Sequence, residues 1–152
     1  EEIAIRADVV LAENPDTFEI KKIHHALGFT ELTLFHEHET SETYEFISIR
    51  VAYDRDSSAA RDDYLMEWGL TGAAGTWEEG VELVERSDYT CCDQSRIGDF
   101  VFEGQTIGML FVAKEGHFVY TVQLFGFTIE DPEGLAALID PRIEALSRRT
   151  SL

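Results

Sequence analysis

The sequence predicts an α+β fold in which helices pack on one face of an antiparallel sheet. Residues 31–53 and 107–125 each alternate apolar and polar side chains on either side of a short turn, the pattern of a β-hairpin. Residues 57–68 and 131–146 instead repeat apolar side chains every three or four positions, the spacing of an amphipathic helix. Hairpins separated by helices are typical of an α+β domain.

The first third of the chain is expected to be mainly β-strand. Short strands are predicted at residues 3–11 and 18–20, and the first hairpin is expected to turn near residues 40–43. The second strand of this hairpin is predicted to bury one face and to present an amphipathic face on the other side. The buried face carries Ile47, Ile49, Val51 and Tyr53, and the amphipathic face carries Phe46, Ser48, Arg50 and Ala52.

A helix is predicted to follow, with Asp56 or Ser57 as its N-cap. Its buried face is expected to carry Ala60, Tyr64, Leu65 and Trp68, and its opposite face Arg61, Asp62 and Asp63. The glycine-rich run at residues 69–75 lacks the Lys and Ser/Thr of a phosphate-binding loop and is expected to be a flexible connector. Residues 77–86 fit both a helix and a strand, and we expect a helix.

The second hairpin follows a strand predicted at residues 99–103. Glu115-Gly116 fits a two-residue turn, because Gly116 adopts positive φ without strain. This turn pairs Phe111 with Tyr120 and Met109 with Val122. One apolar face then carries Ile107, Met109, Phe111, Ala113, Phe118, Tyr120, Val122 and Leu124. The other face is mixed but uncharged, which favours a central position in the sheet.

Composition limits the classes of partner. The 152 residues are predicted to form a single domain spanning residues 1–152. No apolar run approaches the roughly 20 residues that cross a bilayer, so no transmembrane segment is expected. The 30 Asp and Glu against 12 Lys and Arg argue against a nucleic-acid partner. A protein or a small ligand of unknown identity is the expected partner, and no cofactor is predicted.

The acidic balance also bears on environment. The formal net charge is −18, and the only lysines are Lys21, Lys22 and Lys114. Adaptation to high salt is one explanation, because salt screens the repulsion within such a chain. The other is an ordinary acidic exported protein from a genome that favours Arg over Lys.

Two histidines form the candidate metal site. His36 and His38 are two residues apart on a predicted strand, so their side chains point the same way and can share one ion. A zinc site needs at least a third protein ligand. His24, His25, His117 and Cys91 are all candidates for it, and no spacing selects among them. The alternative is an exposed strand end, with His117 a solvent-facing turn residue.

Adjacent cysteines form the candidate redox site. Cys91 and Cys92 are the only two cysteines, which does not suit a disulfide-stapled scaffold. Neighbouring Cα atoms lie about 3.8 Å apart, below the usual disulfide range of about 4.4–6.8 Å, so a bond between them is strained and easily reduced. The alternative is a pair of ordinary thiols, one buried and one facing outward.

The second half resembles a class of exported, often lipid-anchored prokaryotic domains of unknown function. The resemblance rests on the helix at residues 57–68, on Ile97-Gly98-Asp99 leading into a strand, on the turn at residues 114–117 and on a closing helix from Pro132. It implies an extracellular or cell-envelope location and a helix-on-sheet fold, and it supplies no catalytic residue. Because the chain opens at Glu1 without a leader, we expect a mature exported chain or one whose leader has been removed.

These observations favour a non-enzymatic, exported binding or interaction domain without assigned catalytic residues. The alternative is a metal-dependent or thiol-based enzyme that uses His36 and His38 together with Cys91 or Cys92.

Overall fold

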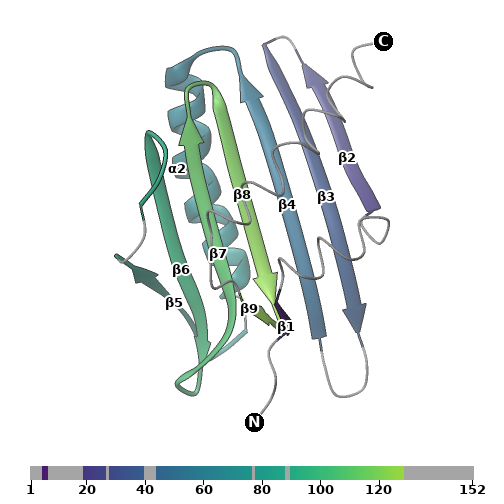
Figure 1. The fold of residues 1–152 in the computed structure, drawn as a ribbon, viewed down its shortest axis with the longest axis vertical. Coiled ribbons are helices and arrows are strands. Elements are labelled where there is room, and N and C mark those ends of the chain that lie inside the picture. Colours follow the sequence, from purple (N-terminus) through teal and green to yellow (C-terminus); the bar gives the residue numbers. More distant parts are fainter. Residues whose placement is uncertain are drawn as a thin grey trace.

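A computed structural model describes residues 5–6, 19–26, 28–39, 44–76, 78–87 and 90–128 (Figure 1). Seven strands form one antiparallel sheet in the order β2-β3-β4-β8-β7-β6-β5. They are β2 (Glu19–Ala26), β3 (Phe29–Glu39), β4 (Tyr44–Asp54), β5 (Val81–Arg86), β6 (Gln94–Phe102), β7 (Gln105–Glu115) and β8 (Phe118–Phe125). The short strands β1 (Ile5–Arg6) and β9 (Phe127–Thr128) pair in parallel as a separate sheet. The helix is α2 (Ser57–Gly75).

The predicted fold class, α+β with helices packed on one face, is wrong. The described residues form a β-rich fold in which a single helix accompanies nine strands. Residues 77–86, expected as a helix, contain strand β5 at the edge of the sheet. Val81 is buried and Leu83 half-buried, whereas Val84, which a helix would have turned inward with Val81, is 48% exposed. The helix expected at residues 131–146 lies outside the described residues.

The chain enters the sheet twice. Strands β2, β3 and β4 follow one another as antiparallel neighbours, and α2 then crosses one face of the sheet to the far edge (Figure 1). Strands β5 to β8 return inward until β8 pairs with β4. The helix contacts β4, β5, β7 and β8. Among the described residues, no helix combines the length and the apolar character needed to cross a membrane.

Both faces of the central strands are buried. The side chains at the contact between α2 and the sheet form one cluster: Ala52, Ala60, Tyr64, Val81, Phe100, Leu110, Val112 and Val119. Those on the opposite face form another: Ile47, Ile49, Val51, Ile97, Met109, Phe111, Ala113, Val122 and Leu124. The central position predicted for the second hairpin is therefore confirmed, since β7 and β8 lie inside the sheet.

The register of this hairpin differs from the predicted one by two residues. Glu115 pairs with Phe118, so the turn is Gly116-His117 and not Glu115-Gly116. Gly116 has the expected positive φ of 58°. As a result Phe111 lies opposite Val122, and the predicted partner Tyr120 lies opposite Ala113. A shift of two residues preserves the faces, because side chains alternate with a period of two.

Ile107 is the exception, and it packs with the cluster under α2. Phe100 pairs with Gly108 and Val101 with Thr106, so Ile107 is an extra residue in β7 opposite β6. Such a β-bulge interrupts the alternation of side chains and moves the residue to the other face.

The first hairpin is confirmed, with β3 and β4 paired from Phe29 and Asp54 to Glu39 and Tyr44. The turn expected near residues 40–43 lies outside the described residues. The strand predicted at 18–20 extends as β2 to Ala26, and the one predicted at 99–103 belongs to the longer β6. Of the strand expected at 3–11, the structure describes β1 alone.

The helix begins as predicted, with Asp56 as its N-cap, but continues through the glycine-rich run expected to be a connector. Gly72 and Gly75 are buried there. A Cβ at Gly75 would overlap the ring of Phe100, and one at Gly72 would lie 2.9 Å from a methyl of Leu83. These glycines therefore allow the last turns of α2 to approach the sheet closely.

Candidate functional site

A charged cluster lies between the sheet and α2, centred on Arg50 of β4. Arg50 donates hydrogen bonds from Nη1 to Asp63 Oδ2 at 2.9 Å and from Nη2 to Asp63 Oδ1 at 3.2 Å. Its Nη2 lies 3.3 Å from Glu31 Oε2, and its Nη1 lies 3.5 Å from Glu67 Oε1. The side chain of Arg50 is only 13% exposed. We call these four residues the Arg50 cluster.

The local geometry of the elements brings this cluster together. Arg50 lies opposite Thr33 in the β3–β4 pairing, so Glu31, two residues earlier on β3, is its diagonal neighbour on the same face. Asp63 and Glu67 are four residues apart on α2 and therefore share one side of the helix. Asp63 was predicted to lie on the exposed side of the helix, and this prediction is wrong because Asp63 is buried.

The cluster carries more negative than positive charge. Burial alone would lower the pKa of Arg50, but the hydrogen bond to Asp63 and the charges of Glu67, Asp63 and Glu31 raise it above its usual value. Arg50 therefore remains a cation. Three carboxylates against one guanidinium leave an excess of two negative charges within these four residues.

Asp54 ends β4 on the same face as Arg50 and is 6% exposed. Its Oδ2 atom is shielded from solvent and has no hydrogen-bond partner in the described part of the chain. Burial, and next the charge of Asp63, raise the pKa of Asp54, and the charge of Arg50 opposes them. A buried carboxylate oxygen without a donor is costly, because it has lost its water and gained nothing in return.

The backbone of Asp54 is held by the β7–β8 turn. Its N–H donates to the carbonyl oxygen of His117 at 2.9 Å, and Nδ1 of His117 lies 3.2 Å from the carbonyl oxygen of Asp54. The imidazole also stacks on Tyr53, with ring centroids 5.6 Å apart. His117, expected as a solvent-facing turn residue, is instead half-buried and fixes the end of β4.

The N-terminus of α2 completes this region. The Asp56 carboxylate accepts hydrogen bonds from the N–H groups of Ser58 at 3.0 Å and Ala59 at 2.9 Å. The bond from Ala59 is the main reason that the pKa of Asp56 lies below its usual value. Arg55 Nε lies 3.2 Å from Asp56 Oδ2 on the surface. The helix end that would otherwise attract an anion is thus already occupied by a carboxylate of the protein.

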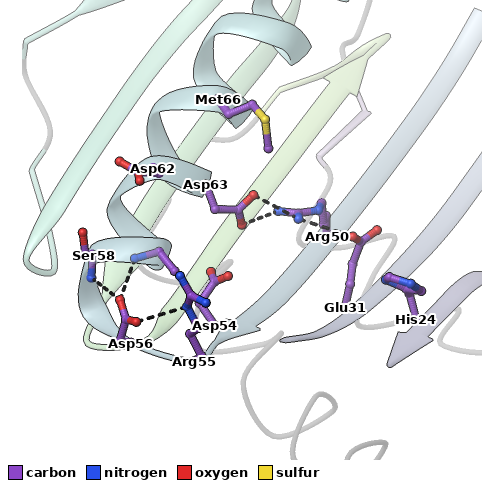
Figure 2. A pocket seen from close by; sticks show the side chains of 11 residues that line it. His24, Glu31, Arg50, Asp54, Arg55, Asp56, Ser58, Asp62, Asp63 and Met66 are labelled. Atoms are coloured by element: carbon purple, nitrogen blue, oxygen red, sulfur yellow. Dashed lines mark hydrogen bonds and ion pairs between the residues drawn. The ribbon is translucent and has the colours of Figure 1, made fainter. Parts of the chain in front are cut away.

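These groups line an open cleft of about 770 Å³ beside the first half of α2 (Figure 2). Its volume falls within the roughly 300–1,000 Å³ of small-molecule sites. The lining residues come from β2, β3, β4, α2 and the connection between β4 and α2: His24, Glu31, Arg50, Asp54, Arg55, Asp56, Ser58, Ala59, Asp62, Asp63 and Met66. Five of them are carboxylates and two are arginines, so the cleft is acidic.

The predicted metal ligands are on the strand that contributes Glu31 to the cleft. His36 and His38 lie on β3, paired with Ile47 and Glu45 toward the end of the strand away from Glu31. Their side chains lie outside the described residues, so the metal site remains a prediction. The candidates for a third ligand are dispersed, with His24 at the cleft, His117 in the β7–β8 turn and Cys91 beside β6. Among the described residues, no three His, Cys, Asp or Glu side chains gather as metal ligands would.

The cysteine pair lies apart from the cleft. Cys91 is half-buried against the cluster on the sheet face opposite α2, and Cys92 is exposed with a φ of 59°. Their sulfur atoms are 2.7 Å apart and carry no disulfide. The neighbouring Asp93 accepts hydrogen bonds from the N–H of Gly116 at 2.9 Å and from Lys114 Nζ at 3.4 Å. The turn that holds both thiols is thereby fixed to the β7–β8 hairpin.

The cleft was not predicted from the sequence. Its signal was present in part: Arg50 interrupts a strand face that includes Phe46 and Ala52, and Asp63 lies beside the buried Tyr64. No family model, curated protein or solved structure matches the chain. The function is therefore argued from the cleft alone.

Proposed function

We propose that this chain is a non-enzymatic domain that binds a small ligand, and that the cleft beside the Arg50 cluster is its binding site. The observation that carries the proposal is Asp54, whose Oδ2 is buried at the cleft without a hydrogen-bond partner in the described part of the chain. A bound group that offers a donor or a positive charge would compensate this oxygen.

The neighbouring charges support binding and not proton transfer. Asp63 and Glu31 each accept a hydrogen bond from the guanidinium of Arg50. Asp56 is tied to the helix N-terminus. Carboxylates engaged in hydrogen bonds in this way set the charge of a cleft, whereas a general acid or base must gain and lose a proton near the working pH.

The alternative of a metal-dependent or thiol-based enzyme has less support. Cys91 packs on the sheet face opposite α2 and Cys92 is exposed, whereas the cleft lies beside α2. The cysteines therefore do not line the cleft, and the side chains of His36 and His38 lie outside the described residues. Elemental analysis after preparation in metal-free buffer separates the alternatives, because stoichiometric zinc, iron or copper would favour the enzyme. The proposal keeps the extracellular or cell-envelope location that the resemblance implies.

The binding site is tested by screening small cationic, neutral and anionic fragments against isotope-labelled protein and recording amide chemical shifts. We expect saturable shifts at the cleft, centred on Asp54, Ala59 and Met66. Amides of the edge strand β5 serve as internal controls, because this strand lies at the far side of the sheet. Saturable binding that maps elsewhere, or no binding by any class of fragment, would contradict the proposal.

A further inference from the structure

Resting on the proposed binding function, we propose that the ligand is a small organic cation, and that its ammonium or guanidinium group lies against Asp54. The inference concerns the class of ligand, so it can fail while the cleft remains a binding site.

The balance of charge in the cleft favours a cationic ligand. Arg50 is already engaged by Asp63, Glu31 and Glu67, and Arg55 is paired with Asp56. Neither arginine donates a hydrogen bond to Asp54 Oδ2. The cleft therefore contains a buried carboxylate with one oxygen atom, Asp54 Oδ2, that no donor of the described chain satisfies, and a cationic ligand would supply the missing donor.

The ion pair beside Asp54 determines whether a ligand can reach this carboxylate. Figure 2 shows Arg55 and Asp56 beside Asp54 at one end of the cleft. The side chain of Arg55 is 74% exposed and that of Asp56 is 51% exposed. An ion pair this exposed is weak because water screens it, so a ligand can displace Arg55 at small cost. A positive group would then lie beside Asp54, where the exposed side chain of Arg55 now stands.

The N-terminus of α2 disfavours an anionic ligand. The N-terminus of a helix is an attractive site for phosphate or carboxylate, because its first N–H groups have no partner within the helix. In α2 the N–H groups of Ser58 and Ala59 are already bonded to the carboxylate of Asp56. A second anion there would be repelled by Asp56 and by the excess charge of the Arg50 cluster.

The described side chains and the size of the cleft favour an organic cation over a metal ion. Within the described chain, no three His, Cys, Asp or Glu side chains gather as metal ligands would. A cleft of about 770 Å³ is also far larger than an ion requires. Met66, which is 52% exposed, and Ala59 add apolar surface to its wall. A positive group carried on a short aliphatic chain fits both the carboxylates and the apolar wall of the cleft.

The experiment is isothermal titration of the full chain at constant ionic strength with 1,4-diaminobutane, agmatine and butylamine. Constant ionic strength matters, because a chain of net charge −18 attracts every cation. Butane-1,4-diol and succinate are the neutral and anionic controls, and calcium and magnesium chloride are the metal arms. We expect saturable binding of at least one amine and none of the diol or succinate.

Two variants locate the binding. Asp54→Asn removes the charge without changing the shape of the side chain and should weaken amine binding by about tenfold or more. Glu103→Gln makes the same change of charge at an exposed turn and should leave binding unchanged. If Asp54→Asn does not fold, Asp62→Asn at the exposed rim of the cleft replaces it, with a smaller loss expected.

Each other outcome overturns the inference. Equal weakening by Glu103→Gln would show that amines bind to the overall charge and not to the cleft. Tighter binding of calcium or magnesium than of any amine would assign the site to a metal. Binding of the diol or succinate at cleft amides would leave the proposed function intact and refute the cationic ligand. Amine binding that shifts only amides outside the cleft would contradict both proposals.

Discussion

Arg50 and Asp63 form a two-point ion pair that joins strand β4 to helix α2, with N···O distances of 2.9 and 3.2 Å. Both side chains are almost fully buried, at 13% and 7% exposure. The pair also fixes the cleft, because it sets the first half of α2 against the sheet at the point where Glu31 and Asp54 line the wall. Its loss should therefore affect stability and ligand binding together.

Replacing Arg50 by Met tests this pair. The variant leaves Glu31, Asp63 and Glu67 close together without their shared cation, and breaking a buried pair in this way typically costs about 3–5 kcal/mol. Urea unfolding followed by circular dichroism measures the change in free energy. The matched control is Arg96→Met, because Arg96 also forms a two-point pair, with Glu85, but at the surface.

The control should lose less. Arg96 is 34% exposed and stacks over Trp68 with its Cζ 4.3 Å from the ring centroid, so we expect a loss of about 1–2 kcal/mol. A second replacement, Asp63→Asn in the Arg50→Met background, should recover part of the lost stability by removing one repelling charge. Equal losses for the two arginine variants would show that burial adds nothing to the Arg50 pair.

The pH dependence of stability should reveal Asp54. Burial and the charge of Asp63 raise its pKa in the folded state, against the effect of Arg50, with smaller contributions from Asp56 and His117. A raised folded pKa means that the folded state binds the proton more tightly than the unfolded state. Asp54 therefore favours folding below its unfolded pKa of about 3.9, and this contribution is lost as the pH rises through the raised folded value.

The Asp54→Asn variant removes this effect. In the absence of ligand it should be more stable than the parent at neutral pH, and the difference should shrink toward zero as the pH falls below about 4. Urea unfolding of both proteins from about pH 3 to about pH 8 provides the comparison. A variant that is less stable than the parent at neutral pH would mean that the Asp54 carboxylate has a stabilising partner, which contradicts its assignment as an uncompensated charge.

The fold was predictable where local patterns decide it. Alternation located the hairpins of β3–β4 and β7–β8, and Asp56 located the start of α2. Long-range packing decided the rest. The glycine-rich end of α2 was predicted to be flexible, but it is helical, and the absence of a side chain at Gly75 lets the helix pack against the ring of Phe100.

The cleft escaped prediction for a similar reason. Arg50, Glu31 and Asp63 come from three elements, and only the register of β3 against β4 and the path of α2 bring them together. His117 contacts Asp54 across 63 positions of sequence, so no local pattern around the turn announces its role. The histidine and cysteine pairs were predicted as candidate sites because their residues are adjacent or nearly so in the sequence.

Two glycines of α2 should respond oppositely to alanine. A Cβ at Gly69 would meet nothing within 4 Å, so Gly69→Ala should stabilise the domain by the helix propensity difference of about 0.5–1 kcal/mol. Gly75→Ala should destabilise it by about 1–3 kcal/mol, because the new methyl group overlaps the Phe100 ring. Thermal unfolding of both variants decides the question, and a stabilised Gly75→Ala would show that α2 does not pack tightly at its end.

The cysteine pair should be open to oxidation, since the two sulfur atoms are 2.7 Å apart and Cys92 is exposed. Treatment with a small disulfide such as oxidised glutathione would transfer two electrons from the thiols to the reagent and join Cys91 to Cys92. We expect the intact mass to fall by two hydrogen atoms and to return on mild reduction, because a bond between neighbouring residues is strained. The Cys92→Ser variant should show no such loss, and an unchanged parent mass would leave two ordinary thiols.

Salt should stabilise this domain if its acidity is an adaptation. A net charge of −18 repels itself, and the Arg50 cluster gathers three carboxylates around one cation, so screening should favour the compact state. We expect the melting temperature to rise markedly between about 0.05 and 2 M KCl, because the Debye length falls to about 3 Å near 1 M. Potassium sulfate is unsuitable for this test, since sulfate also strengthens apolar burial.

Removing exposed charge by Asp62→Asn together with Glu103→Gln should raise the melting temperature at low salt and reduce its further rise with KCl. A flat profile for the parent chain would instead favour an ordinary acidic exported protein, with its few lysines explained by genome composition.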